Sequence, residues 1–191
     1  MRSSLLILLL SITTVAMADV RLWVAASSAP NGNLGGRTGA DNFCNTDANK
    51  PVVAGSTTRA FISVSAADEI QDMPTLYSIP TNEAIYRADG TTVMASNFAA
   101  LLNTGTTPLT NNVGFATFVT TGSTDLGVLD YTCNGWTDGS GAGTATVGQS
   151  NSTDNLYLSF ATSTCNLTVK LYCMTYTPLA ASSAGTDITD W

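Results

Sequence analysis

The chain of 191 residues contains no histidine, and this absence excludes several common kinds of active site. Ser–His and Cys–His nucleophile pairs, histidine general bases and histidine-liganded zinc all need an imidazole. Charged residues are scarce as well, at 11% against about a quarter of an average protein. The 14 acidic residues outnumber the 7 basic ones, and the net charge of −7 disfavours nucleic acids and anionic membranes as partners.

Long hydrophobic runs are also missing, except at the beginning of the chain. Arg2 precedes the apolar run Leu5–Leu10, and small residues follow it as far as Ala18. A positive start, a short apolar segment and an Ala-x-Ala end are typical of a secretory signal peptide. A transmembrane helix needs about 20 apolar residues, more than this segment offers. We therefore predict a signal peptide over residues 1–18 and an exported chain that does not insert into a membrane after cleavage.

All four cysteines follow the predicted cleavage point: Cys44, Cys133, Cys165 and Cys173. An even number of cysteines in an exported chain predicts two disulfides, and the sequence pattern leaves three pairings open. The cysteines show no Cys-x-x-Cys spacing and have no histidine to complete a metal site, so we assign them a structural role. Trp136 follows Cys133 closely, and we expect its side chain in the core rather than in a ligand site.

Strand and helix patterns alternate irregularly over residues 19–177, which predicts a single α+β domain. Val20–Val24 is rich in branched and aromatic side chains and is expected to form a strand. Ala40, Phe43 and Cys44 follow the i, i+3, i+4 spacing of one helix face, so we expect them to be buried together.

The remaining elements are predicted from the same patterns. Strands are expected over residues 60–64, 116–121, 126–133, 156–160 and 167–176, and helices over residues 66–72 and 97–102, capped by Ser65 and Ser96. Residues 137–155 consist mainly of Gly, Ser, Thr and Asn, which predicts a long exposed loop. Residues 178–191 are small and polar and are expected to form a flexible tail.

The predicted loop contains oxygen-bearing residues of the kind that calcium prefers. The candidate ligands are Asp138, Asn151, Asp154 and Asn155. They show no Asp-x-Asp spacing, so a solvated polar loop is the main interpretation and calcium the alternative. The glycines at 139–143 lack the lysine and the strand-to-helix setting of a phosphate-binding loop. We expect no other cofactor.

Carboxylate pairs are the acid–base groups that remain for catalysis. The candidates are Asp125, Asp130, Asp138 and Asp154 around the predicted loop, and Glu83 with Asp89. Glycoside hydrolysis needs two carboxyl groups at a fixed separation, one of them with a raised pKa. Most of these residues stand beside Gly, Asn or Thr, and Asp89–Gly90 is typical of a turn. We therefore predict no catalytic residue and a protein that is not an enzyme.

Five segments carry motifs in a recognisable order. They are residues 31–36 followed by Gly39–Asp41 and Cys44, then Arg59–Ser63, Ser96–Leu101, Thr132–Thr137 and Cys165–Cys173. In this order they resemble a bacterial secreted domain family of unknown function that is related to endostatin. The resemblance covers residues 20–176.

The resemblance implies a C-type-lectin-like (endostatin-like) single domain with a mixed, mainly antiparallel sheet and short helices. It also implies that Cys44 pairs with Cys173 and Cys133 with Cys165. The ligands of the related proteins are not implied. Endostatin binds zinc through histidines and heparin through clustered arginines, whereas this chain has no histidine and its basic residues are scattered. The calcium motifs of sugar-binding lectins, Glu-Pro-Asn and Gln-Pro-Asp, are absent too.

From these observations we expect an exported, non-enzymatic recognition or adhesion module of a bacterial cell surface or secretome. Its ligand would be a glycan or a protein, bound by the loop over Thr137–Asn155. The alternative is a structural subunit of a surface layer or extracellular filament. Low charge, abundant Ser, Thr and Gly, and a tail ending in Trp191 would suit self-association.

Overall fold

The computed structural model describes residues 19–102 and 107–179, so the predicted signal peptide and residues 180–191 of the predicted tail lie outside it. The strands are β1 (Val20–Val24), β2 (Thr57–Ala60), β3 (Ile85–Tyr86), β4 (Val93–Ala95), β5 (Phe118–Thr120), β6 (Thr144–Gln149), β7 (Ala161–Thr164) and β8 (Tyr172–Tyr176). The helices are α1 (Gly36–Thr46), α2 (Met73–Tyr77), α3 (Phe98–Leu101) and α4 (Cys133–Trp136), with 3-10 turns η1 (Ile70–Asp72) and η2 (Asn155–Tyr157). Within the described ranges, no helix is both long enough and apolar enough to cross a membrane.

The two ends of the domain pair with each other in the larger sheet. Its strand order is β2-β8-β1-β3-β4, and only β1 and β3 run parallel. β1 and β8 are antiparallel, with Val20 opposite Tyr176 and Val24 opposite Tyr172. The structure is therefore a mixed α+β domain with a mainly antiparallel sheet, as predicted, and the strand expected over Val20–Val24 is confirmed.

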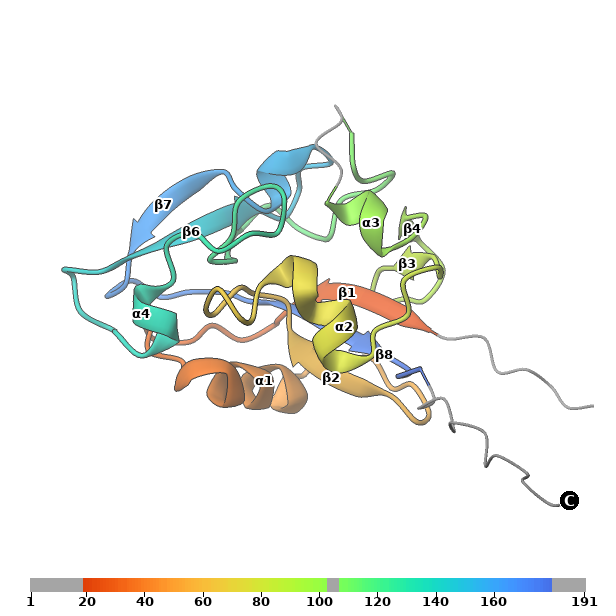
Figure 1. The fold of residues 1–191 in the computed structure, drawn as a ribbon, viewed down its shortest axis with the longest axis horizontal. Helices are drawn as coiled ribbons and strands as arrows, with labels where there is room; N and C mark the ends of the chain where they lie inside the picture. Colours follow the sequence, from red (N-terminus) through yellow and green to blue (C-terminus); the bar gives the residue numbers. More distant parts are fainter. Residues whose placement is uncertain (1–18, 103–106, 180–191) are drawn as a thin grey trace, which may run out of the picture.

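The larger sheet separates two hydrophobic cores, because successive side chains of a strand point to opposite faces. Leu22 belongs to one core and Trp23 to the other. Helix α1 covers the second core, where Ala40 and Cys44 are buried beneath the sheet and Phe43 packs at the margin (Figure 1). The predicted helix face is therefore confirmed.

A second, three-stranded sheet has the order β5-β6-β7 and lies above the first in Figure 1. The two sheets meet where Thr120 forms a bridge to Leu171, and the Thr120 N–H donates to the Lys170 carbonyl at 2.9 Å. The central strand β6 corrects the prediction of one long exposed loop over residues 137–155, because most of its residues are buried. Small residues are needed in this strand because other backbone segments pack closely against it. A Cβ on Gly148, for example, would lie 1.8 Å from the Tyr157 carbonyl oxygen.

The strand and helix predicted between residues 60 and 72 are wrong in position. β2 ends at Ala60, and Arg37 donates to the carbonyl of Ala60 and to that of Ile62 just after the strand, both at 2.7 Å. Instead of capping a helix, Ser65 forms a tight turn with Asp68, whose carboxylate is bound by Arg37 at 2.8 Å. Asp68 thus forms a long-range ion pair with Arg37, and the helix that Ser65 was expected to cap is absent at this position.

The predicted strand over residues 126–133 is also wrong. Its final residue begins α4, a single turn in which Cys133, Asn134, Gly135 and Trp136 all have positive φ. This backbone turns Trp136 into the core, fully buried, where its indole N–H donates to the Ser63 carbonyl at 2.7 Å. The prediction that Trp136 is a core residue is therefore confirmed.

The other predictions differ in detail. Residues 156–160 are not a strand, because Asp154 caps the turn η2 by accepting from the Leu156 N–H at 3.0 Å. Helix α3 is present within residues 97–102, but Asn97 rather than Ser96 caps it. The strands expected over residues 116–121 and 167–176 are present but shorter.

Two disulfides join distant parts of the fold. Cys44 of α1 is bonded to Cys173 of β8, and Cys133 of α4 is bonded to Cys165 at the end of β7. This is the pairing that the resemblance implies. The first bridge ties a helix to β8, an interior strand of the larger sheet, and the second ties α4 to the smaller sheet.

We expect the two bridges to stabilise the domain unequally, because a longer closed loop restricts the unfolded chain more. The cysteines are 129 residues apart in the first bridge and 32 in the second. Replacing Cys44 and Cys173 by Ala should lower the free energy of unfolding by about 5 kcal/mol, and replacing Cys133 and Cys165 by about 4 kcal/mol. Denaturant unfolding of both double variants measures this, and the reverse order would contradict it.

Candidate ligand-binding cleft

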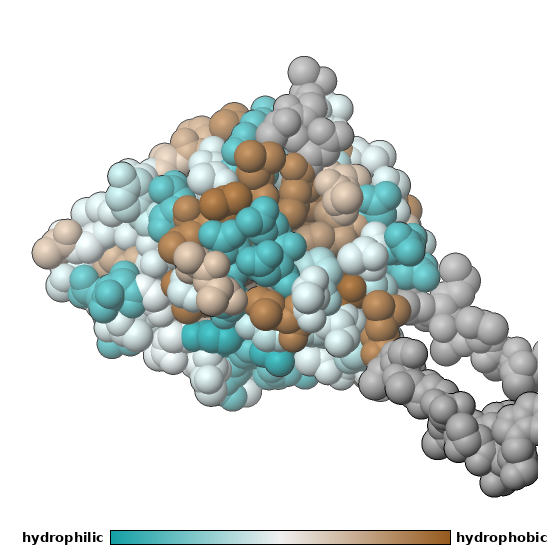
Figure 2. Space-filling model, in the orientation of Figure 1, coloured by the Kyte–Doolittle hydropathy of each residue, from teal (hydrophilic) through white to brown (hydrophobic). Residues whose placement is uncertain are grey.

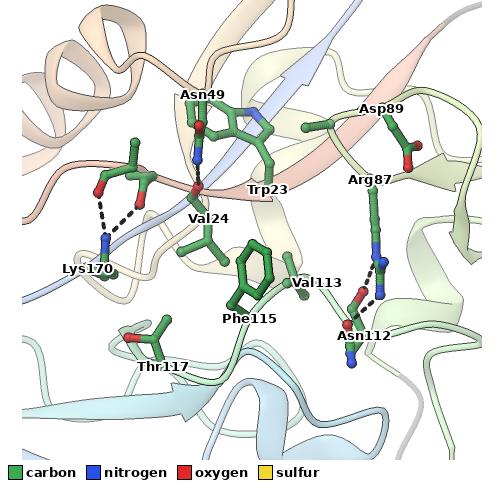
Figure 3. Close-up of a pocket in the computed structure, with 14 residues that line it drawn as sticks. Trp23, Val24, Asn49, Arg87, Asp89, Asn112, Val113, Phe115, Thr117 and Lys170 are labelled. Atoms are coloured by element: carbon green, nitrogen blue, oxygen red, sulfur yellow. Dashed lines mark hydrogen bonds between the residues drawn. The ribbon is translucent and has the colours of Figure 1, made fainter.

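A cleft of about 790 Å³ opens where the end of β1 faces the segment that leads into β5 (Figure 3). Trp23 and Val24 line it from β1, and Val113, Phe115 and Thr117 line it from the opposite segment. Its volume lies in the range of sites for small molecules. The cleft is therefore the candidate site, although it lies outside the predicted loop.

The loop that follows β1 is held in place by one buried carboxylate. Asp47 accepts hydrogen bonds from the backbone N–H groups of Ala26 at 2.8 Å, Ser27 at 2.9 Å and Asn49 at 2.9 Å. Burial by itself raises the pKa of Asp47, but these hydrogen bonds to the charged form outweigh it, and the pKa falls below its usual value. Ala26 and Asn49 line the cleft, so Asp47 fixes one of its walls.

Lys170 attaches the same loop to the chain that enters β8. Its ammonium group donates to the carbonyls of Ala25 at 3.1 Å, Ala26 at 2.7 Å and Ser27 at 3.4 Å. Figure 3 shows the side chain reaching this loop at the edge of the cleft. A positive charge is therefore fixed at the site without a carboxylate beside it.

Arg87 is fixed on another wall by Asn112. The Arg87 Nε donates to the Asn112 carbonyl at 2.7 Å, and its Nη2 donates to the Asn112 side-chain oxygen. Asp89 follows in the turn between β3 and β4 and also lines the cleft. Its carboxylate accepts from the backbone N–H groups of Thr92 and Thr91, both at 2.8 Å, and these bonds hold its pKa far below the usual range. The predicted turn at Asp89 is therefore confirmed.

Phe115 is 95% exposed although it lies in an ordered segment. The buried side chain of Ser150 anchors this segment: its hydroxyl donates to the Phe115 carbonyl and accepts from the Thr117 N–H at 3.1 Å. The Ser150 carbonyl accepts from Val113 at 3.0 Å. The backbone is thus fixed on both sides of a phenyl ring that contributes almost nothing to the core.

Charges are distributed unevenly around the cleft. Arg21, Arg37 and Arg59 form ion pairs with aspartates. Within residues 19–102 and 107–179, Lys50, Arg87 and Lys170 have no carboxylate oxygen within ion-pair distance. Two of these three cations line the cleft.

The structure does not bring the four calcium candidates together. Asp138 lies before β6 and Asn151 after it, and the six residues of β6 span about 20 Å. Asp154 caps η2, and the Asn155 amide donates to Asp125 at 2.9 Å. In the described part of the chain, no three Cys, Asp or Glu side chains form a group that could hold a metal.

The candidate carboxylates also form hydrogen bonds within the fold. Asp130 accepts from the Thr146 hydroxyl at 2.7 Å, and Asp138 accepts from the Ser140 N–H at 2.7 Å, which lowers its pKa. Asp125 binds Asn155, and Asp89 forms its turn. Glu83 lies in the bend before β3 and does not line the cleft. Each of the four aspartates stabilises a turn or a loop.

The family model described as "Protein of unknown function (DUF1554)" matches residues 27–153, more than half of the chain. The chain belongs to this family. No curated protein matches it. The matched region contains the cleft residues Asn49, Arg87, Asn112 and Phe115, whereas Trp23 and Lys170 lie outside it.

Sequence reasoning did not identify the cleft, because its walls come from segments far apart in the chain. Arg87 and Asn112 are 25 residues apart, and Lys170 contacts residues more than 140 positions earlier. No local signal distinguishes Phe115, because Val113 stands two residues before it and Phe118 three residues after it, at spacings that a strand or helix face would share.

Replacing Asp47 by Asn should loosen the wall that contains Ala26. The amide nitrogen of the new side chain would donate rather than accept, so at least one backbone N–H loses its partner, and stability should fall by about 1.5–3 kcal/mol. Because the pKa of Asp47 is lowered in the folded state, its contribution is present above its ordinary pKa of 3.8 and is lost as the pH falls through its lower folded value.

Denaturant unfolding across acidic pH measures this effect. The Asp47→Asn variant should be less stable at neutral pH and should lose less stability than the wild type below pH about 4. Asp72→Asn is the matched control, since the Asp72 carboxylate accepts no hydrogen bond from the described part of the chain. Parallel pH curves for wild type and Asp47→Asn would contradict the assignment.

Proposed function

We propose that the protein is a non-enzymatic recognition module whose ligand binds in the cleft beside Phe115. The observation that carries the proposal is the exposed phenyl ring, held by Ser150 at a concave surface. Exposed apolar groups at a cleft with a few fixed polar groups mark binding sites. The proposed binding site is therefore this cleft and not the loop over Thr137–Asn155 that the sequence suggested.

We also propose that the module is exported and that its fold is C-type-lectin-like. The predicted signal peptide supports export, and two disulfides are typical of proteins in oxidising compartments. The antiparallel pairing of β1 with β8 and the disulfide from α1 to β8 support the fold assignment. The hydrogen bonds that the candidate carboxylates Asp130 and Asp125 form within the fold support a function other than catalysis.

A glycan and protein array probed with residues 19–191, with and without calcium, tests this proposal. The Phe115→Ala variant should bind the recognised ligand about tenfold more weakly, because the aromatic contact is worth about 0.5–1.5 kcal/mol beyond its buried area. Tyr131→Ala is the matched control, since Tyr131 is 55% exposed and does not line the cleft. Absence of binding to every array component, or equal binding by Phe115→Ala and wild type, would overturn the proposal.

A second candidate function is self-assembly through the outer face of the smaller sheet. The rings of Phe118 and Phe160 stack there at 5.5 Å, both exposed, beside the exposed Leu167 and a groove of about 320 Å³. Strand β7 is an edge strand without a charged residue, which is a ready template for pairing with another chain.

The scarcity of charge on the smaller sheet favours a second copy of the protein as its partner. Residues 139–169 contain one charged side chain, Asp154, in a protein of net charge −7. In Figure 2 the end of the molecule where β6 and β7 lie is mostly pale, the colour of intermediate hydropathy. Two copies that meet through this sheet therefore keep most of their negative charges apart.

Sedimentation velocity over a range of concentrations tests the second candidate. The wild type should assemble as its concentration rises, and Phe118→Glu should shift assembly to at least tenfold higher concentration, since it places a charge on the contact. Val52→Glu is the matched control, because Val52 is 99% exposed on another part of the surface. A wild type that stays monomeric at high concentration would overturn this candidate.

A further inference from the structure

We infer that the cleft binds an acidic saccharide, in which a sugar ring packs on Phe115 and a carboxylate is bound by Arg87. The inference rests on the proposed recognition function and specifies its ligand class. Figure 3 shows Phe115 in the middle of the cleft, with Lys170 and Arg87 on either side of it in that view.

The first argument is charge. The chain as a whole carries −7, yet the charged side chains that line the cleft are two cations and one anion. The anion, Asp89, already accepts from Thr91 and Thr92 in its own turn, including the Thr92 hydroxyl at 2.7 Å. The two cations have no carboxylate partner within the described ranges, so the cleft attracts a negative charge that the rest of the surface repels.

The second argument is the geometry of Arg87. Asn112 engages Nε and Nη2, while Nη1 forms no hydrogen bond with any residue in the described ranges. The guanidinium is therefore held in one orientation with donors left over for a ligand. Because the side chain is already ordered, little conformational entropy is lost when a carboxylate binds it.

Lys170 contributes differently. Its ammonium group already donates to three carbonyls, so it adds positive potential rather than a free donor. Its attraction for an anion depends on distance and not on direction, and salt screens it.

The third argument concerns the body of the ligand. The other polar groups along the cleft are the amides of Asn49 and Asn112 and the hydroxyl of Thr117. Amides and hydroxyls both donate and accept, which matches sugar hydroxyl groups. The exposed Phe115 ring offers a flat apolar face to the C–H side of a sugar ring. An anionic group on a hydroxyl-rich body fits this lining better than a purely apolar or purely anionic ligand does.

The test compares two trisaccharides that differ only at C6 of each sugar, which is a carboxylate in one probe and a hydroxymethyl group in the other. Isothermal titration calorimetry of residues 19–191 is carried out with a galacturonic acid trimer and with the neutral galactose trimer of the same linkage. We expect the acidic trimer to bind about tenfold more tightly, a difference that one charge-assisted hydrogen bond supplies. The difference should shrink as salt is added.

Arg87→Gln should remove the preference for the acidic trimer, so that the two trimers bind this variant with equal affinity. Arg87→Lys keeps the charge but loses the fork of donors, so it should retain part of the preference. Lys50→Gln is the matched control, because it removes a cation that lacks an ion pair within the described ranges and lies outside the cleft. Thermal unfolding of each variant shows that it is folded.

The outcomes separate this inference from the proposed function. Equal binding of both trimers, or binding of neutral glycans alone, would overturn the acidic ligand and leave the recognition function standing. Binding of an acidic peptide instead of either trimer would overturn the saccharide class. Failure to bind the trimers and every array component would overturn the inference and the recognition function together.

Discussion

Strand β8 and the residues that lead into it are the constraint on which the rest of the structure depends. β8 lies between β1 and β2, so the last strand of the domain can join the sheet only between the first two. Cys173 bonds it to α1, and just before it Leu171 bridges to Thr120 of the smaller sheet. These contacts join segments more than 45 residues apart. The positions of both sheets therefore depend on contacts between residues that are distant in the sequence.

The candidate site follows from this junction. Lys170 stands at the point where the chain passes from the smaller sheet to β8, and it holds the loop that begins with Ala25. Ser150 fixes the segment of Phe115 from the other side. The cleft is therefore the space between the end of β1 and the segment that leads into β5. Its polar groups are held by hydrogen bonds that belong to the fold, which keeps the site ordered before a ligand arrives.

Local patterns predicted helix α1 and the strands β1, β5 and β8, whereas they placed β2 wrongly and did not predict β3, β4, β6 or β7. Val20–Val24 and the buried face of α1 follow ordinary periodicity. The composition of residues 144–149 predicts a loop, because Thr, Ala and Gly carry little hydrophobic signal, yet these residues form β6, and Gly148 is needed where Tyr157 approaches the backbone. Near Asp68, the ion pair with Arg37 overrode the local capping preference. Local patterns fail here because the deciding contacts are tertiary.

The sequence by itself determined the absence of histidine chemistry, the scarcity of charge, the even number of cysteines and the mixed order of strands and helices. These properties depend on composition or on neighbours along the chain. Only the tertiary structure decided that β6 separates Asp138 from the other three calcium candidates and that Arg87, Phe115 and Lys170 line one cleft. The physical reason is that the residues of a binding site must lie close together in the folded structure, whatever their separation along the chain. In this fold that proximity is set by β8, which brings the two ends of the domain together.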